Sequence, residues 1–205
     1  MDDTTPRERR GERTRQSILE AALALVIEKG LNKLSLREIA RRADYSPAGL
    51  YEYFASKDAI IDALICDASD RFFAHLSRVS TALPVDEYLV ELGMTYIEFA
   101  HLNPDHFMMM FTHYQALPVV NLSDFAPSGG SNAYGLLMDA VQRALDSGLF
   151  QAQPGYDKVG MTYSFWSLVH GLAILQATYL RQFTWDFATA DRQAIRTFIE
   201  GLRRG

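Results

Sequence analysis

The chain has 205 residues, of which 48% are hydrophobic and 22% charged, and it carries a net charge of −5. This composition excludes a disordered or fibrous chain, and the length is sufficient for a substantial buried core. The single cysteine, Cys66, excludes an intramolecular disulfide and a zinc site with several cysteine ligands. The longest apolar runs are shorter than the ~20 residues of a membrane span, and the charged start lacks a signal-peptide core. We therefore expect a soluble, cytoplasmic protein with no membrane partner.

Charge is unevenly distributed along the chain. The first 60 residues carry 11 lysines and arginines against 10 acidic residues, whereas the remainder carries 9 against 15. A locally basic N-terminal part on an acidic body is compatible with DNA contact at one end only. We expect residues 1–12 to form a flexible basic tail that either follows DNA or is simply solvated. The arginines at this end are Arg7, Arg9, Arg10, Arg13 and Arg15.

The pattern of apolar residues is helical throughout, and no alternating strand pattern or tight hairpin turn is present. The fold class expected is therefore all-α, with about nine helices. The first helix is predicted over 13–29 and ends at Gly30, because a glycine commonly follows the last helical turn. Beyond Pro84, helices are predicted over 85–102, 104–114, 132–147, 156–181 and 189–203. The stretch 117–131, which contains two prolines and two glycines, is predicted to be a long irregular loop.

Two short helices are predicted between the first helix and a long fourth helix. Ser35 and Glu38 have the spacing of a capping box. In this motif the serine oxygen accepts a hydrogen bond from the Glu38 amide, and the glutamate carboxylate accepts one from the Ser35 amide. Ser46 followed by Pro47 is a second helix start, and Ser56 begins the long helix that runs toward Arg78. Two short helices joined by a tight turn and braced by a first helix form a helix-turn-helix.

The residues of this region resemble the DNA-binding domain of TetR-family regulators. The resemblance lies in Arg15–Ala22, Leu34–Ala40 and the block Ser46–Asp58, which reads SPAGLYEYFASKD, and it spans about 13–64 without gaps. It implies a helix-turn-helix domain over 13–58 and a helical ligand-binding and dimerisation domain over 59–205. In the second part, Trp166–Gly171 resembles the Trp-x-x-x-His-Gly element of one branch of the family.

A recognition helix enters the major groove with its first residues toward the bases, while neighbouring elements hold phosphates. The residues nearest the bases would then be Ser46, Pro47, Ala48 and Gly49, which are small and suit a thymine methyl or a close approach. Arg37 is the best candidate for a specific contact to guanine. Phosphate contacts are expected from Ser35, Tyr51, Tyr53 and Lys57, although Tyr51 could instead pack in the core. Arg41 and Arg42 either contact the backbone or are solvated.

A DNA-binding helix-turn-helix that reads paired half-sites implies a two-fold homodimer. We expect its interface to include the apolar stripe of the last helix, Ile195, Phe198, Ile199 and Leu202. The alternative is that this stripe packs within the chain's own core.

The middle of the chain is rich in methionine and aromatic residues, which suit a pocket for a hydrophobic effector but also a plain core. The candidate pocket residues are Met94, Phe99, Phe107, Met110, Tyr114, Tyr163, Trp166 and His170. His170 is the candidate polar anchor for such an effector. The histidines have no second ligand at a zinc spacing, so no metal and no cofactor are expected.

These residues predict a ligand-responsive DNA-binding regulator, with a repressor released from a palindromic operator by a small hydrophobic effector as the favoured form. We expect no enzymatic activity, because no catalytic constellation is present. A helical small-molecule binding protein or enzyme with a vestigial helix-turn-helix stays open as the alternative.

Overall fold

The computed structural model describes residues 5–112 and 132–203. Within these ranges the chain forms nine α-helices and one short 3₁₀ helix, with no strand. The all-α prediction is confirmed. The chain divides into two compact units, Met1–Asp67 and Ala68–Gly205. The division falls inside the fourth helix.

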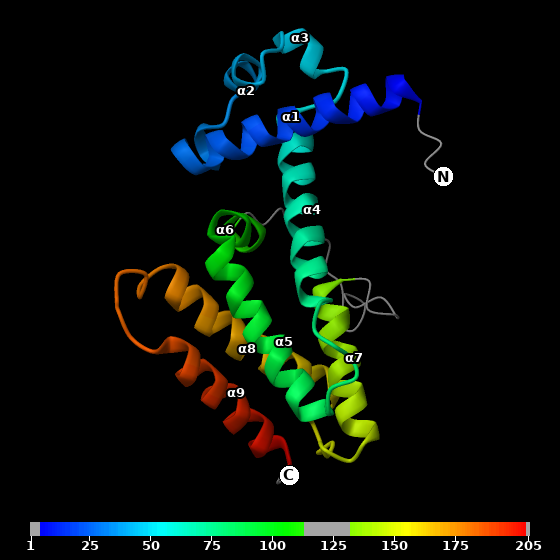
Figure 1. Ribbon diagram of the computed structural model, residues 1–205, viewed down its shortest axis with the longest axis vertical. Coiled ribbons are helices and arrows are strands. Elements are labelled where there is room, and N and C mark those ends of the chain that lie inside the picture. The colour runs from blue at the N-terminus through cyan, green and yellow to red at the C-terminus, as the bar shows by residue number, and fades with distance from the viewer. Residues whose placement is uncertain (1–4, 113–131, 204–205) are drawn as a thin grey trace. The chain divides into compact units, whose positions relative to one another are not determined.

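The first unit contains a long helix and two short ones (Figure 1), followed by the start of a second long helix. The bounds are α1 (Pro6–Lys29), the 3₁₀ helix η1 (Leu31–Lys33), α2 (Leu36–Arg42), α3 (Pro47–Leu50) and α4 (Lys57–Leu76). Its largest fully buried side chains come from all four α-helices: Ile18, Leu25, Ile39, Leu50 and Ile60. The short helices are thus held by apolar side chains that meet in one core, since helices of this length are not stable alone.

Helix α1 begins well before the expected start near Arg13. Thr5 accepts a hydrogen bond from the Glu8 amide (3.3 Å), and the Thr5 amide donates to the Glu8 carboxylate (2.7 Å). Pro6 occupies the first helical position, where its missing amide costs nothing. The prediction of a flexible tail is therefore wrong for residues 6–12, which a complete capping box makes helical. Residues 1–4 lie outside the described residues.

The second unit contains five further helices, of which four pack around α5 (Val85–Leu102). The others are α6 (Pro104–Thr112), α7 (Ala133–Asp146), α8 (Lys158–Ala177) and α9 (Phe187–Arg203), each close to its predicted range. Helix α5 packs most extensively against α8 and also contacts α6, α7 and α9. The predicted irregular loop and the last residues of the helix predicted to end at 114 lie outside the described residues.

Gly93 allows α5 to approach α8 and α9 closely. A Cβ atom at Gly93 would lie 2.8 Å from Cδ1 of Ile195 and 3.1 Å from Cγ1 of Val169. No side-chain atom fits at such separations without a shift of its neighbours. The small residue is therefore a packing requirement of this core.

The apolar stripe of α9 faces this core. Ile195, Ile199 and Leu202 are buried within the chain, and Phe198 packs edge-on against Phe165 with ring centroids 5.8 Å apart. The expectation that Ile195, Phe198, Ile199 and Leu202 form a dimer interface is wrong for the three aliphatic residues, because α5 and α8 already cover them.

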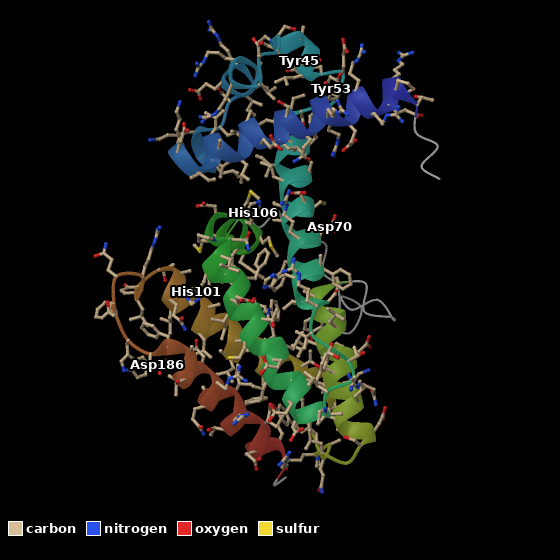
Figure 2. All side chains as sticks on the ribbon, viewed as in Figure 1. Tyr45, Tyr53, Asp70, His101, His106 and Asp186 are labelled. Carbon is tan, nitrogen blue, oxygen red and sulfur yellow. The ribbon has the colours of Figure 1, made fainter. Side chains whose placement is uncertain are left out.

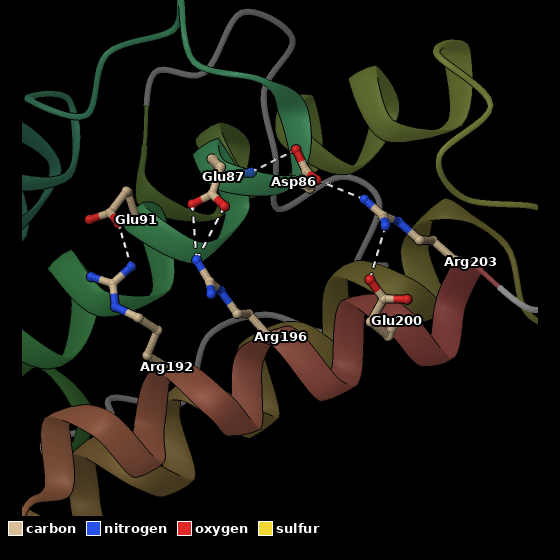
Figure 3. A network of polar contacts seen from close by, with 7 residues as sticks. All are labelled: Asp86, Glu87, Glu91, Arg192, Arg196, Glu200 and Arg203. Atoms are coloured by element: carbon tan, nitrogen blue, oxygen red, sulfur yellow. Dashed lines mark hydrogen bonds and ion pairs between the residues drawn. The ribbon is translucent and has the colours of Figure 1, made fainter.

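Three ion pairs between α5 and α9 border this packed face (Figure 3). Arg192 pairs with Glu91 (2.5 Å), Arg196 with Glu87 (3.2 Å) and Arg203 with Asp86 (2.7 Å). These side chains are 37–49% exposed, so each pair adds little to stability by itself. The three pairs nevertheless form together in this alignment of α9 along α5, so they favour this alignment.

Among the described residues, none of the helices combines the length and the apolar character that crossing a membrane requires.

Candidate functional site

The corner between α2 and α3 is built by local hydrogen bonds. Asp44 has a φ of 57°, a left-handed conformation that Asp tolerates better than most residues. The Tyr45 amide donates to the carbonyl of Ala40 (2.8 Å), and the Ala43 amide donates to Ile39 (2.9 Å). A left-handed residue with a bond spanning the last helical turn is the pattern of a Schellman motif. The motif ends α2 and directs the chain straight into α3.

Helix α3 starts as predicted. The Ser46 hydroxyl accepts from the Gly49 amide (2.9 Å), and Pro47 is the first helical residue. Ser46, Pro47 and Ala48 are exposed, and Gly49 is partly exposed. The structure therefore brings the four predicted base-facing residues together on the outer surface of the first unit, while Leu50 anchors the same helix in the core.

Helix α2 is capped by Ser35, but with a different partner arrangement from the one predicted. The Ser35 hydroxyl accepts from the Glu38 amide (3.3 Å) and donates to the Glu38 carboxylate (3.3 Å). The carboxylate also pairs with Lys29 of α1, rather than reaching back to the Ser35 amide. The Ser35 proton is therefore already engaged, which weakens its candidacy as a phosphate donor.

The remaining DNA-contact candidates differ in their surroundings. Arg37 is exposed, and Tyr51 is 59% exposed, so Tyr51 does not pack in the core. Lys57 is partly exposed at the first position of α4, where Ser56 accepts from the Ala59 amide (3.1 Å). Arg42 of α2 pairs with Glu28 of α1 (2.6 Å), which gives this arginine a role in holding the two helices together.

Tyr53 belongs to a cluster that was not predicted from the sequence. Its ring meets that of Tyr45 edge-on, with centroids 6.0 Å apart, and both hydroxyls hydrogen-bond to each other and to Thr14 of α1. The Thr14 and Tyr53 bonds hold the pKa of Tyr45 below its usual value, and the Tyr45 bond raises the pKa of Tyr53. Figure 2 shows the two tyrosines between α3 and α1. No local signal in the sequence singles out Tyr45, because its exposure follows from the turn at Asp44.

The second unit contains an aromatic cluster around one buried hydroxyl. The Tyr96 hydroxyl lies 2.8 Å from Nδ1 of His170 and accepts from Nε1 of Trp166 (3.3 Å). Phe107 and Phe111 of α6 surround the imidazole, with ring centroids 5.7 and 4.6 Å from it. Burial raises the pKa of Tyr96 and lowers that of His170. Neutral forms of both groups are thus favoured. The Trp and His of the element at 166–171 meet at one oxygen atom.

The predicted pocket residues separate into groups. Phe99 and Phe107 are buried in the core, while Met94, Met110 and Trp166 are partly buried against it and His170 is partly buried beside Phe107. Tyr163 is 54% exposed and does not join the others. Tyr114 lies outside the described residues. A separate groove of about 280 Å³ lies between α4 and α5 and involves none of these eight; its lining includes His75, Arg78, Glu91, Thr95 and Glu98.

No group of three or more histidine, cysteine or carboxylate side chains is placed to hold a metal ion in 5–112 and 132–203.

Comparison with known families covers both units. Residues 18–64 match the family described as bacterial regulatory proteins, tetR family. Residues 89–199 match a tetracyclin repressor-like C-terminal domain.

Among curated proteins, the chain is 28% identical over 161 residues to the HTH-type transcriptional repressor KstR2 of Mycobacterium tuberculosis, an alignment that covers 77% of this chain and 75% of KstR2. It is 33% identical over 78 residues to the HTH-type transcriptional regulator UidR of Escherichia coli, which covers 38% of this chain and spans only 40% of UidR.

Solved structures share the fold over nearly the whole chain. A protein of unknown function from Rhodococcus sp. RHA1 has a TM-score of 0.76 at 23% identity, with 93% of this chain and 95% of that chain covered. A TetR family transcription regulator from Marinobacter aquaeolei has a TM-score of 0.69 at 20% identity, with 95% and 97% covered.

Proposed function

Since this chain belongs to the TetR family of bacterial regulatory proteins, we propose that it is a transcriptional repressor that binds a palindromic operator as a homodimer and is released by a small hydrophobic effector. The observation that carries the proposal is the exposed start of α3, at Ser46, Pro47 and Ala48. These side chains do not contribute to the core, and the helix that holds them is fixed by Leu50 and the Ser46 cap. A short, rigid helix with its first turn outward is the form that enters a major groove.

DNA binding is tested with a duplex selected by the full-length protein from a random-sequence library. We expect a palindromic consensus, and affinity at least about 10³-fold above that for a scrambled duplex of equal length. Arg37→Ala should reduce discrimination at one position of each half-site by about 1–3 kcal/mol. Equal affinity for the selected and scrambled duplexes would contradict the proposal.

A second copy of the chain is proposed to pack on the outer face of α8. Tyr163, Ser167 and Leu175 are exposed, and Gly171 is partly exposed, at intervals of one helical turn. The opposite side of α8 carries Phe165 and Val169, which are already buried within the chain. A helix that is apolar on more than one face is expected to be covered on each of them. Leu175→Glu should therefore convert a dimer, measured by sedimentation velocity, to a monomer, whereas a monomeric wild-type chain would contradict this part of the proposal.

The effector is proposed to contact the aromatic cluster of Tyr96, Phe111 and His170. The Tyr96 hydroxyl donates a hydrogen bond to Nδ1 of His170, so the neutral imidazole carries its proton on Nε2. This Nε2 proton can be donated to a carbonyl or carboxylate of the effector. The surrounding rings favour a flat apolar body. Native mass spectrometry of the purified protein would identify a retained ligand, and adding that compound should release the selected duplex. Ligand turnover without any effect on DNA binding would favour the alternative of an enzyme with a vestigial helix-turn-helix.

A further inference from the structure

We propose that Thr14, Tyr45 and Tyr53 form one hydroxyl site that binds a phosphate of the DNA backbone, with Tyr45 as its central residue. This inference rests on the proposed DNA-binding function and adds to it a contact made jointly by α1 and the α2–α3 turn. We call these three residues the hydroxyl cluster.

The backbone of Tyr45 is held firmly at the outer corner of the helix-turn-helix. Its amide bonds to Ala40 (2.8 Å), and the preceding residue, Asp44, is in the left-handed conformation that turns the chain. The next residue, Ser46, caps α3. The side chain of Tyr45 therefore leaves the backbone between the end of one short helix and the start of the next.

The ring of Tyr45 is positioned by its neighbours and yet remains exposed. It lies edge-on to Tyr53, and its Cδ1 atom would be 3.0 Å from a Cβ atom at position 49, so Gly49 is the residue that makes room for it. Despite these contacts the side chain is 40% exposed. A large aromatic side chain that is fixed in place, but not buried, is suited to binding rather than to core packing.

The hydroxyl cluster can bind an anion without losing its internal bonds. Each hydroxyl is both a donor and an acceptor, and its proton rotates about the C–O bond. One proton can therefore turn toward a phosphate oxygen while the others keep the three groups together. Tyrosine and threonine hydroxyls are common donors to DNA phosphates.

The charges beside the hydroxyl cluster come from α1 and from the segment after α3. Arg10 is exposed one helical turn before Thr14, on the same side of α1, and supplies positive charge. Glu52 is the acidic group whose charge acts on both tyrosines: it adds to the raised pKa of Tyr53 and opposes the lowering of the pKa of Tyr45. Because Glu52 would repel a phosphate, Glu52→Gln should bind DNA more tightly than the wild type.

The test compares Tyr45→Phe with the wild type on the selected duplex. The variant keeps the ring against Tyr53 and Gly49 and loses only the hydroxyl, so affinity should fall roughly three- to tenfold. The slope of affinity against salt should stay unchanged, since no cation has been removed. Tyr179→Phe, a tyrosine that is 85% exposed in the second unit, is the matched control and should bind as the wild type. Thermal unfolding of each variant reports whether it folds.

A phosphate scan separates a direct contact from an indirect effect. Duplexes are made with one methylphosphonate at each position in turn, which removes the charge and one acceptor oxygen. At one position per half-site, the methylphosphonate should lower the affinity of the wild type. At that position the difference in affinity between the wild type and Tyr45→Phe should disappear, and so should the difference between the wild type and Thr14→Val. A Tyr45→Phe variant that binds as the wild type, or a loss that is the same at every methylphosphonate position, would overturn the inference. Wild-type protein that selects no duplex would overturn the proposed function, and this inference with it.

Discussion

The hydroxyl of Tyr96 in α5 lies 2.8 Å from Nδ1 of His170 in α8, and the same oxygen accepts from the indole of Trp166. The indole can only donate, so the tyrosine proton is left for the imidazole, which must be neutral at Nδ1 to accept it. One oxygen atom thus satisfies two side chains one helical turn apart. This bond gives the Trp and His of the element at 166–171 a structural role.

Removing this oxygen should destabilise the second unit. In a Tyr96→Phe variant, the Trp166 donor and the His170 acceptor both lose their partner in a largely apolar environment. We expect the free energy of unfolding to fall by about 1–3 kcal/mol, measured by urea denaturation. Tyr179→Phe, which removes the hydroxyl of a side chain that is 85% exposed in the second unit, is the control and should be neutral. Unchanged stability of Tyr96→Phe would show that water replaces the hydroxyl.

The stability of the protein should depend on the protonation of His170. Burial lowers the pKa of His170 below its ordinary value of 6.5. The unfolded chain therefore binds this proton more readily, and the contribution of neutral His170 is present above about pH 6.5 and is lost as the pH falls toward the lower, folded-state pKa. In a His170→Gln variant, the fall in stability between about pH 7 and pH 5 should be smaller than in the wild type. A steeper fall in the variant would contradict the assignment.

The helix-turn-helix was predictable because its signals are local. Ser35, Ser46 and Ser56 each cap the helix that follows within a few residues, and a cap is decided by its immediate sequence. Thr5 and Glu8 have the same local pattern, so the start of α1 at Pro6 could also have been predicted from the sequence.

The role of the α9 stripe was not predictable in this way. An amphipathic stripe has the same sequence whether its own chain or a second copy covers it. Ile195 is buried beside Gly93, a residue 102 positions earlier in the chain, where Val169 and Phe165 of α8 also lie. Only the tertiary structure distinguishes the two possibilities. Tyr45 is a similar case, because its exposure depends on the direction of the turn at Asp44.

A single methyl group at Gly93 should disturb this core. In Gly93→Ala, the new Cβ would meet Cδ1 of Ile195 at 2.8 Å, so we expect a loss of about 1–3 kcal/mol in the free energy of unfolding, despite the better helix propensity of alanine. Ile195→Val removes the Cδ1 atom. The double variant should therefore be more stable than the sum of the two single changes predicts, and simple additivity of the two effects would show that the clash is relieved elsewhere.

The buried carboxylate of Asp191 is expected to reduce stability at neutral pH. It is 3% exposed and accepts twice from Nε2 of Gln176 (3.1 and 2.9 Å), while Oε1 of Gln176 is buried without a partner. Burial raises the pKa of Asp191, against the smaller opposing effects of Gln176 and His101. The charged form is thus disfavoured in the folded state, and stability falls as the pH rises from the unfolded-state pKa through the raised one.

Asp191→Asn removes this charge and supplies an amide that can donate to Oε1 of Gln176 while its oxygen still accepts from Nε2. We expect a gain of about 1 kcal/mol in the free energy of unfolding near neutral pH, which vanishes at about pH 3, where the native carboxyl is protonated. Asp191→Ala should instead lose about 1–3 kcal/mol, because the Gln176 donor is left unpaired. An asparagine variant less stable than the wild type at neutral pH would mean that the ion contributes more than its burial costs.

Lys57 should contribute to DNA affinity through its charge alone. It begins α4 directly after the Ser56 cap and is partly exposed, so its ammonium group can reach a phosphate. A lysine that neutralises a phosphate releases bound cations, and Lys57→Ala should flatten the plot of log affinity against log salt by about 0.9 for each phosphate that is no longer neutralised. In a two-fold dimer one phosphate per protomer is affected, so the full change would be about twice that value. Lys158, which begins α8 in the second unit, is the matched control. An unchanged slope in Lys57→Ala would show that the Lys57 charge does not contribute to DNA affinity. An equal change in Lys158→Ala would show that the position of Lys57 does not matter. Either result would remove Lys57 from the phosphate-binding residues.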